Sequence, residues 1–185
     1  MVLIAITGAT GIQIAIALLK ILKELNIKTE LIISKAAKVV MEKEIEKQIS
    51  EIYDLASKHY DIDDIAAAPA SGSYKIDKMV IVPCTMKTLS AIANGYSSNL
   101  ITRAADVMIK EQRKLVLVVR ESPLNAIHLE NMLKLARLGV IIAPPVPSYY
   151  IKPKTVDDLI NYTAGRILDQ IGVDSGIKRW GNEDE

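Results

Sequence analysis

Three hydroxyl side chains, Ser34, Thr85 and Thr88, follow apolar runs that have the composition of buried strands. A turn of sequence Gly-Ala-Thr-Gly at residues 8–11 follows another such run and precedes an apolar helical segment. Backbone N–H groups at a helix start favour anions, and hydroxyls can donate to phosphate oxygens. Because the chain has neither a Walker lysine motif nor Gly-x-Gly-x-x-Gly, these residues predict a mononucleotide phosphate held without hydrolysis. Taken alone, the turn at 8–11 is equally consistent with a strand-to-helix connection that binds nothing.

The stretch from residue 79 to 123 predicts how such groups are positioned. A strand over 79–82 ends at Pro83 and Cys84, and Thr85 or Thr88 then caps a helix that runs to Ala93. A second helix over 100–112 leads to a second buried strand over 115–119. Parallel strands bring their carboxyl ends to one edge of a sheet, so residues 84–85 and 120–121 are expected at one crevice.

The rest of the chain continues the alternation of strand and helix. Further strands are predicted over 2–6, 30–33 and 140–142, which makes five in all, and further helices over 12–25, 35–44, 45–57, 122–138 and 155–171. Residues 61–74 form an irregular loop, and residues 143–150 a proline-stiffened one. This order predicts an α/β fold: a single domain over 1–185 with a flavodoxin- or Rossmann-like doubly wound parallel sheet. The helix over 12–25 has only a narrow polar stripe, so a neighbouring subunit is expected to cover the side that the sheet does not.

Composition excludes several classes of protein. The chain has 185 residues with 23 basic and 22 acidic side chains, and no basic patch with interleaved aromatics, so no nucleic-acid partner is expected. The apolar run over 12–22 is too short and too polar to span a bilayer, and no signal sequence opens the chain. We therefore expect no membrane association and a cytoplasmic location.

Few side chains match a metal centre or a nucleophile. Cys84, the single cysteine, could be an activated thiol at a helix start, but a small packed residue is the favoured interpretation. His59 and His128 are far apart and lie in no metal-ligand or serine-protease pattern, so both are interpreted as structural. No metal site is expected.

Several motifs occur along the chain: Thr-Gly-Ala-Thr-Gly at 7–11, Ile-Ser-Lys-Ala-Ala at 33–37, Pro-Ala-Ser-Gly-Ser at 69–73, Pro-Cys-Thr-Met-Lys-Thr-Leu-Ser-Ala-Ile-Ala at 83–93, Asn-Leu-Ile-Thr-Arg-Ala-Ala-Asp at 99–106 and Arg-Glu-Ser-Pro at 120–123. In this order they resemble the motifs of one family, the UbiX-type flavin prenyltransferases, which are related to the fungal phenylacrylic acid decarboxylase proteins. The resemblance covers nearly the whole chain.

The resemblance implies an activity and its partners. Such enzymes join a dimethylallyl group, from dimethylallyl phosphate, to N5 and then C6 of reduced FMN without a metal, and the prenylated FMN serves a UbiD-type decarboxylase. They assemble into homo-oligomers, commonly dodecamers, with sites at subunit contacts. Which of the mono- and diphosphate is the donor is left open by the sequence.

The resemblance also implies roles for particular residues. The positions that match the family's FMN contacts are Gly8, Ala9, Thr10, Ser34, Thr85, Met86, Lys87, Thr88 and Arg120. Tyr150 and Arg166 match the positions that bind the prenyl phosphate, with Lys110 beside them, and Glu44 and Glu121 match an acidic pair near the reacting centre. By residue type alone, Lys110 and Glu44 are also consistent with solvated helix charges.

Two departures and two alternatives accompany this interpretation. Thr10 stands where the family usually has serine, and Ile65 where it has an aromatic residue, which affects the prenyl pocket more than the FMN site. An FMN-dependent cysteine decarboxylase on the same scaffold would use a histidine and a Pro-Ala-Ser-Ala-Asn-Thr segment, whereas residues 69–73 are Pro-Ala-Ser-Gly-Ser. A non-catalytic flavin-binding subunit is the other alternative.

Overall fold

A six-stranded parallel sheet organises the chain in the computed structural model, which describes residues 1–46 and 48–181. The strands are β1 (Val2–Ile6), β2 (Thr29–Ile33), β3 (Lys58–Tyr60), β4 (Lys78–Cys84), β5 (Lys114–Val119) and β6 (Ile141–Ile142). They lie in the order β3-β2-β1-β4-β5-β6, and each neighbouring pair is parallel. The order reverses between β1 and β4, which is where open α/β sheets bind their ligands.

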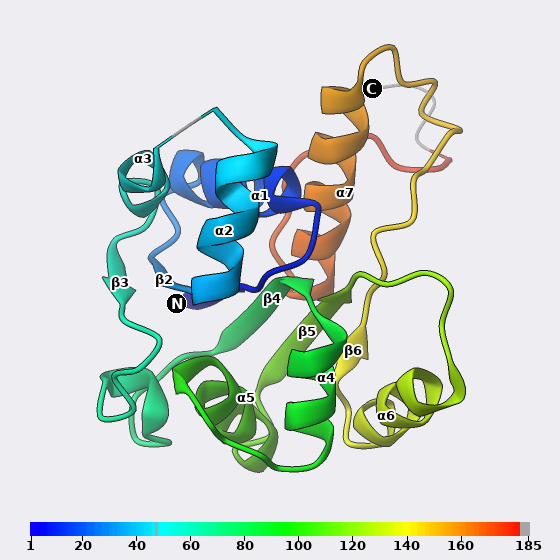
Figure 1. The fold of residues 1–185 in the computed structure, drawn as a ribbon. Helices are drawn as coiled ribbons and strands as arrows, with labels where there is room; N and C mark the ends of the chain where they lie inside the picture. Colours follow the sequence, from blue (N-terminus) through cyan, green and yellow to red (C-terminus); the bar gives the residue numbers. More distant parts are fainter. Residues whose placement is uncertain (47, 182–185) are drawn as a thin grey trace.

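Helices cover both faces of the sheet (Figure 1). They are α1 (Ile12–Glu24), α2 (Lys35–Glu44), α3 (Ile49–Tyr53), α4 (Met86–Ala93), α5 (Leu100–Lys110), α6 (Ala126–Arg137) and α7 (Val156–Gln170), with a 3₁₀ turn at Ala68–Ala70. Alternate strand residues point to opposite faces, so Ile4 and Val80 pack under α1, α2 and α7, whereas Leu3 and Ile81 pack under α4, α5 and α6. Burial on both faces explains why these strands are continuous apolar runs.

The expectation of five strands is wrong by one, because β3 is a sixth strand at the edge beside β2. Its sequence, Lys-His-Tyr, has no apolar run, since two of its three side chains are exposed at the edge. The helix predicted over 45–57 is also wrong: only Ile49–Tyr53 is helical, and residue 47 lies outside the described residues. Residues 58–60 form a strand because they pair with β2, and local periodicity does not reveal this pairing.

The helix predicted to start at Ser122 and Pro123 begins later. Asn125 is the N-cap of α6, and its side-chain Oδ1 accepts the backbone N–H of His128 at 2.9 Å. His128 Nδ1 accepts the backbone N–H of Asn125 in return, at 3.4 Å. This reciprocal cap is a capping box with histidine at the third helical position, which the usual sequence pattern omits. It confirms a structural role for His128.

The apolar helix α1 is covered from within the chain, which corrects the expectation that a neighbouring subunit covers it. α7 packs along α1, so Ile16 and Leu19 join Ala164 and Leu168 in the same core cluster. The contact joins elements that are far apart in sequence, and the amphipathicity of α1 alone does not identify its partner. Over the described ranges, no helix combines the length and apolar character needed to cross a membrane.

Gly8 lies where the turn after β1 approaches the start of α2. A Cβ at Gly8 would lie 2.5 Å from Cβ of Ala36 and 2.9 Å from its carbonyl carbon, so only glycine fits this contact. We expect Gly8→Ala to lower the free energy of unfolding by about 1–3 kcal/mol, since backbone atoms must move. Urea unfolding measures the change, and the double variant Gly8→Ala/Ala36→Gly should recover part of it. Equal stability of the double and single variants would contradict this account.

Candidate functional site

Hydrogen bonds join the carboxyl ends of four neighbouring strands into one edge. After β1, the Thr7 hydroxyl donates to the carbonyl of Pro83 at 2.7 Å and accepts the N–H of Thr85 at 2.9 Å. The N–H of Ser34 donates to the carbonyl of Ile6 at 2.9 Å. The N–H of Arg120 donates to the carbonyl of Cys84 at 3.1 Å. The predicted convergence of residues 84–85 with residues 120–121 is therefore confirmed.

Two helices start at this edge, α2 on one face of the sheet and α4 on the other, each with a hydroxyl cap. Ser34 Oγ accepts the N–H of Ala37 at 3.0 Å, and Thr85 Oγ1 accepts the N–H of Thr88 at 3.2 Å. Thr85, and not Thr88, is thus the cap of α4; its hydroxyl donates to Thr88 Oγ1 at 3.0 Å. The first N–H groups of a helix have no partner within it, so those of α2 and α4 that the two caps do not bind can donate to an anion.

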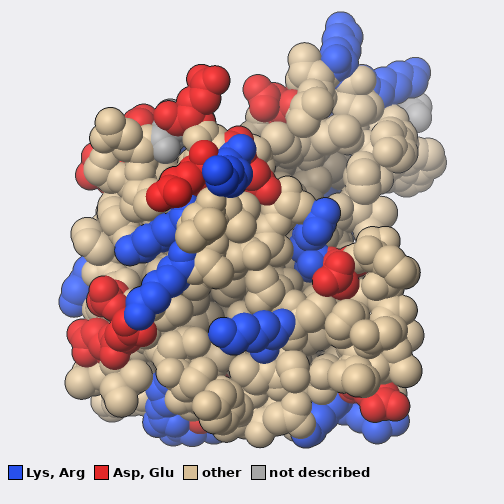
Figure 2. All heavy atoms as spheres, viewed as in Figure 1, with Lys and Arg blue, Asp and Glu red and all other residues tan. Residues whose placement is uncertain are grey.

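Basic side chains surround these helix starts. Lysine and arginine side chains cross this face of the molecule over α2 and α4 (Figure 2), and Lys35 and Lys87 lie in the first turns of those helices. Both lysines are exposed, as is Arg120 at the end of β5, and Lys35 forms an ion pair with Asp63. The edge therefore combines helix N-termini, hydroxyls and cationic side chains, which together suit a phosphate group.

The side chain of Glu44, the last residue of α2, binds the start of α1. Its Oε2 accepts the N–H groups of Gly11 at 3.0 Å and Ile12 at 3.3 Å, and its carbonyl accepts from Gln13 Nε2 at 3.2 Å. We expected the N–H groups at this helix start to be available to a phosphate. The N–H groups of Gly11 and Ile12 are not, because Glu44 accepts both. Glu44 thus contacts α1, whereas the Glu121 carboxylate accepts the N–H of Ser122 at 3.0 Å.

This contact gives Glu44 a measurable structural effect. We expect Glu44→Ala to lower the free energy of unfolding by about 1–2 kcal/mol, because two helix-start amides lose a charged acceptor. Glu44→Gln should lower it less, since the amide oxygen still accepts. Glu42→Ala, an exposed glutamate on the same helix, is the matched control in urea unfolding. A Glu44→Ala curve that overlays the wild-type curve would show that the cap contributes nothing.

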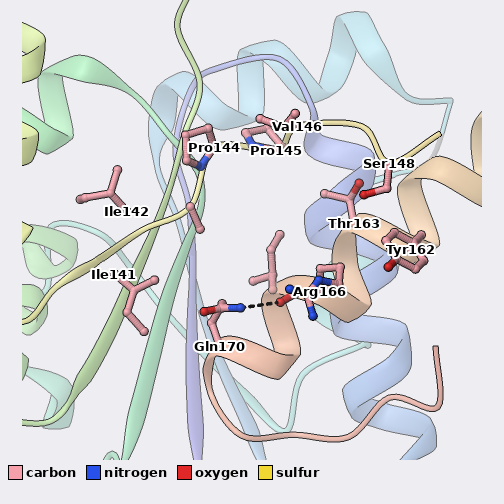
Figure 3. A pocket seen from close by; sticks show the side chains of 12 residues that line it. Ile141, Ile142, Pro144, Pro145, Val146, Ser148, Tyr162, Thr163, Arg166 and Gln170 are labelled. Atoms are coloured by element: carbon pink, nitrogen blue, oxygen red, sulfur yellow. Dashed lines mark hydrogen bonds between the residues drawn. The ribbon is translucent and has the colours of Figure 1, made fainter. Parts of the chain in front are cut away.

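A cavity of about 300 Å³ lies between β6, the loop that follows it and α7 (Figure 3). β6 and the loop after it contribute a mainly apolar side, Ile141, Ile142, Ala143, Pro144, Pro145, Val146 and Ser148, and α7 contributes Tyr162, Thr163, Arg166, Ile167 and Gln170. Arg166 and Tyr162 come from successive turns of α7, so they share one face of the helix. The cavity therefore combines a cation and hydroxyls with an apolar wall.

Tyr150 is connected to this cavity through Tyr162. The two phenol hydroxyls hydrogen-bond, and the rings meet edge to face with centroids 5.9 Å apart. Burial, followed by the hydrogen bond from Tyr150, raises the pKa of Tyr162 to about 12, so its hydroxyl keeps its proton at neutral pH. Tyr150 thus contacts Tyr162, which lines the cavity together with Arg166. Sequence reasoning missed Tyr162, although its spacing from Arg166 along a helix was a usable signal.

Lys110 is not brought to this cavity. It ends α5, just before β5 starts at Lys114, and so lies at the edge where the strands begin. Arg166 and Tyr150 belong instead to the cavity at the end of β6. The Lys110 ammonium pairs with the Glu111 carboxylate at 2.6 Å. Within one chain, Lys110 therefore lies away from the cavity that contains Arg166.

Cys84 is a packed residue, which confirms the favoured interpretation. Its side chain is buried among residues of the α4–α5 face, and burial raises the pKa of its thiol to about 12. His59 stacks on Tyr53 with ring centroids 4.2 Å apart, which also agrees with a structural role. Across residues 1–46 and 48–181, no three His, Cys, Asp or Glu side chains gather in a way that could hold a metal ion.

The raised pKa of Cys84 predicts a pH dependence of stability. Above about pH 8.5 the unfolded chain loses the thiol proton, whereas the folded chain keeps it up to about pH 12. The unfolded state then binds fewer protons, so folding stability falls as pH rises through this window. At pH 9.5 the wild type should have lost about 1 kcal/mol more than Cys84→Ala, relative to pH 7, in urea unfolding. Parallel pH profiles of the two proteins would contradict the prediction.

Comparisons with known proteins agree with this geometry. The model of the Flavoprotein family matches residues 1–168. The chain is 51% identical over 181 residues to a flavin prenyltransferase UbiX of Methanocaldococcus jannaschii, covering 97% of this chain and 98% of the relative.

Two crystal structures are also similar. One is AnUbiX (PadA1) in complex with FMN and dimethylallyl pyrophosphate, with a TM-score of 0.95, 47% identity and coverage of 97% of this chain and 96% of that one. The other is a dodecameric FMN-dependent UbiX-like decarboxylase of Escherichia coli O157:H7, with a TM-score of 0.93, 45% identity and coverage of 96% and 98%. The family model, together with the relative at 51% identity and the two solved structures that are each matched over nearly their whole length, shows that the chain belongs to the Flavoprotein family and, within it, to the UbiX-type flavin prenyltransferases.

Proposed function

We propose that this protein transfers a dimethylallyl group from dimethylallyl phosphate to N5 and C6 of reduced FMN. The observation that carries the proposal is that two regions at the carboxyl edge of the sheet have groups that suit a phosphate: the helix starts of α2 and α4, and the cavity that contains Arg166. Two substrates that each carry a phosphate need two such regions. The solved relative with both FMN and dimethylallyl pyrophosphate supports this assignment.

The edge formed by β1, β2, β4 and β5 would hold FMN. Ser34 and Thr85 position the starts of α2 and α4, and Lys87, Met86 and Thr88 lie in the first turn of α4. Gly8, Ala9 and Thr10 line the turn after β1, and Arg120 follows β5. The fit is supported by Gly8, whose missing side chain lets this turn lie directly against the start of α2. The isoalloxazine ring supplies the nucleophilic atoms when FMN is bound.

The cavity beside β6 would hold the donor. As the allylic C–O bond breaks, negative charge grows on the phosphate, and the Arg166 guanidinium with the tyrosine hydroxyls would stabilise it. Tyr150 takes part through its bond to Tyr162. The apolar wall of prolines, Val146 and isoleucines would exclude water from the allylic group. Glu121, exposed at the end of β5, would exchange protons at the phosphate, and Glu44 would act by holding the start of α1.

Lys110 would complete a donor site from a second copy of the chain. Within one chain Lys110 lies at the edge where the strands begin, away from Arg166. Its ammonium group would therefore reach a phosphate near Arg166 only from another subunit. This requires a homo-oligomer, and the dodecameric assembly of the related Escherichia coli protein supports one. A dodecamer is our proposal for this chain as well.

The product would act elsewhere. Prenylated FMN has no further use at a site built to make it, so we propose that it passes to a UbiD-type decarboxylase in the cytoplasm. Adding the released flavin to such a decarboxylase in its flavin-free form, and measuring decarboxylation of its acid, tests this transfer. Activity that appears equally with unmodified FMN would contradict it.

Anaerobic incubation with reduced FMN and dimethylallyl phosphate tests the main proposal. Mass spectrometry of the released flavin should find a species heavier than FMN by one C5H8 unit. Unmodified FMN with both the mono- and diphosphate donors would overturn the proposal. A peptidyl or pantothenoyl cysteine would then be offered, because decarboxylation of such a substrate is the alternative on this scaffold.

A further inference from the structure

The tail of the chain, residues 173–181, turns back along α7 (red trace in Figure 1). Its approach to the helix depends on Gly165, the neighbour of Arg166. A Cβ at Gly165 would lie 2.3 Å from Cγ2 of Ile177 and 2.7 Å from Oγ of Ser175. The tail therefore packs directly on the turn of α7 that carries Arg166.

Asp169 lies between an arginine of the cavity and an arginine of the tail. Its Oδ2 accepts from Arg166 Nη1 at 2.7 Å and from Arg179 Nη1 at 2.9 Å, and its Oδ1 accepts from Arg179 Nη2 at 2.9 Å. The Asp169 side chain is only 11% exposed, so its charge needs these partners. Arg179 also reaches the exposed Asp174 at 3.0 Å. Arg179 and Asp169 thus form a bidentate pair with two parallel hydrogen bonds, which fixes the orientation of both side chains.

The next residue of the tail contacts the other side of the donor site. The Trp180 ring meets the Tyr150 ring edge to face, with centroids 5.1 Å apart. Tyr150 in turn bonds to Tyr162 of the cavity. Neighbouring residues of the tail thus contact Asp169 and Tyr150, and each of these contacts a polar side chain of the cavity wall.

We infer that Arg179 is a positioning residue for the donor phosphate, acting through Asp169 on Arg166. The inference rests on the role proposed above for Arg166. Arg179 fixes the Asp169 carboxylate, which orients the Arg166 guanidinium along the cavity wall. Arg179 also offsets the charge of that carboxylate: Arg166, Asp169 and Arg179 together carry one positive charge, whereas Arg166 and Asp169 alone carry none. Without Arg179, Asp169 would compete with the phosphate for Arg166.

The test compares Arg179→Gln and Arg179→Lys in the full chain. With reduced FMN present, we expect Arg179→Gln to raise KM for dimethylallyl phosphate about tenfold with a smaller change in kcat. Arg179→Lys keeps the charge but loses the fork, so its KM should lie between those of Arg179→Gln and the wild type. The FMN dissociation constant should be unchanged in both. Arg137→Gln, an exposed arginine at the end of α6, is the matched control.

A second variant displaces the tail without altering any charge. A methyl group at Gly165 must push Ile177 and Ser175 away, so Gly165→Ala should raise KM for the donor as Arg179→Gln does. Trp180 is the single tryptophan of the chain, so its fluorescence anisotropy in the flavin-free protein reports whether the tail stays on α7. We expect lower anisotropy for Gly165→Ala and for Arg179→Gln than for the wild type.

The possible results distinguish the role inferred for Arg179 from the role proposed for Arg166. If Arg166→Ala raises the donor KM and Arg179→Gln does not, the positioning role is wrong and the role of Arg166 stands. If Arg166→Ala changes nothing, both fail. A fall in Trp180 anisotropy with an unchanged donor KM would show that the tail only packs on α7. An equal loss of FMN binding and donor binding would show a general structural defect, which also overturns the inference.

Discussion

Replacing Arg166 by alanine is expected to lower kcat/KM for the dimethylallyl donor by about 100-fold or more, while FMN affinity stays within about twofold. Arg166 lines the cavity from α7, and phosphate gains negative charge as the allylic bond breaks. Its charge is therefore needed most in the transition state. Ser34 and Thr85 cap other helices, so the variant leaves the FMN edge unaltered.

The measurement pairs anaerobic turnover, followed by mass spectrometry of the flavin, with a titration of FMN. Arg166→Lys is the conservative variant: it keeps the positive charge but cannot bind Asp169 and a phosphate with one planar fork, so it should recover only part of the activity. Turnover of Arg166→Ala at the wild-type rate would remove Arg166 from the mechanism. Loss of FMN binding would show that the cavity and the FMN edge are one site.

Replacing Lys110 by alanine is expected to lower turnover by about 100-fold as well, and a second inactive variant should restore it. When Lys110→Ala and Arg166→Ala chains are co-expressed in equal amounts, about one quarter of the sites should combine an intact Lys110 from one chain with an intact Arg166 from another. Activity should then return to about a quarter of the wild-type value. Restoration follows because Lys110 and Arg166 lie at different places in one chain.

The alternatives give distinct results. If Lys110 acted within its own chain, every mixed site would lack one group and the co-expressed protein would stay inactive. If Lys110 were only a solvated helix charge paired with Glu111, then Lys110→Ala alone would keep full turnover. Size-exclusion chromatography with light scattering on each variant serves as the control, since a variant that fails to assemble would also be inactive.

The local sequence was sufficient to predict the parts of the fold that depend on burial and capping. The runs that became β1, β2, β4 and β5 are apolar because both faces of the sheet are covered, so their composition alone marks them. The Thr85 cap depends on an amide three residues away and was predicted, whereas the Asn125 cap of α6 pairs with a histidine that the usual pattern omits. The motifs that resemble the UbiX family are likewise continuous in sequence, and the comparisons confirm the family.

Only the tertiary structure decided which distant groups meet. The strand β3 exists because β2 pairs with it, and α1 is covered because α7 packs on it. Glu44 binds the start of α1, and Arg179 binds Asp169 behind Arg166, through contacts that no local pattern records. The sequence by itself therefore determined the buried apolar strands and the helices that follow them, since burial and local capping leave a signal within a few residues, but it did not determine the edge strand β3. The tertiary structure decided how charges are paired, because that depends on where separate elements are packed against one another.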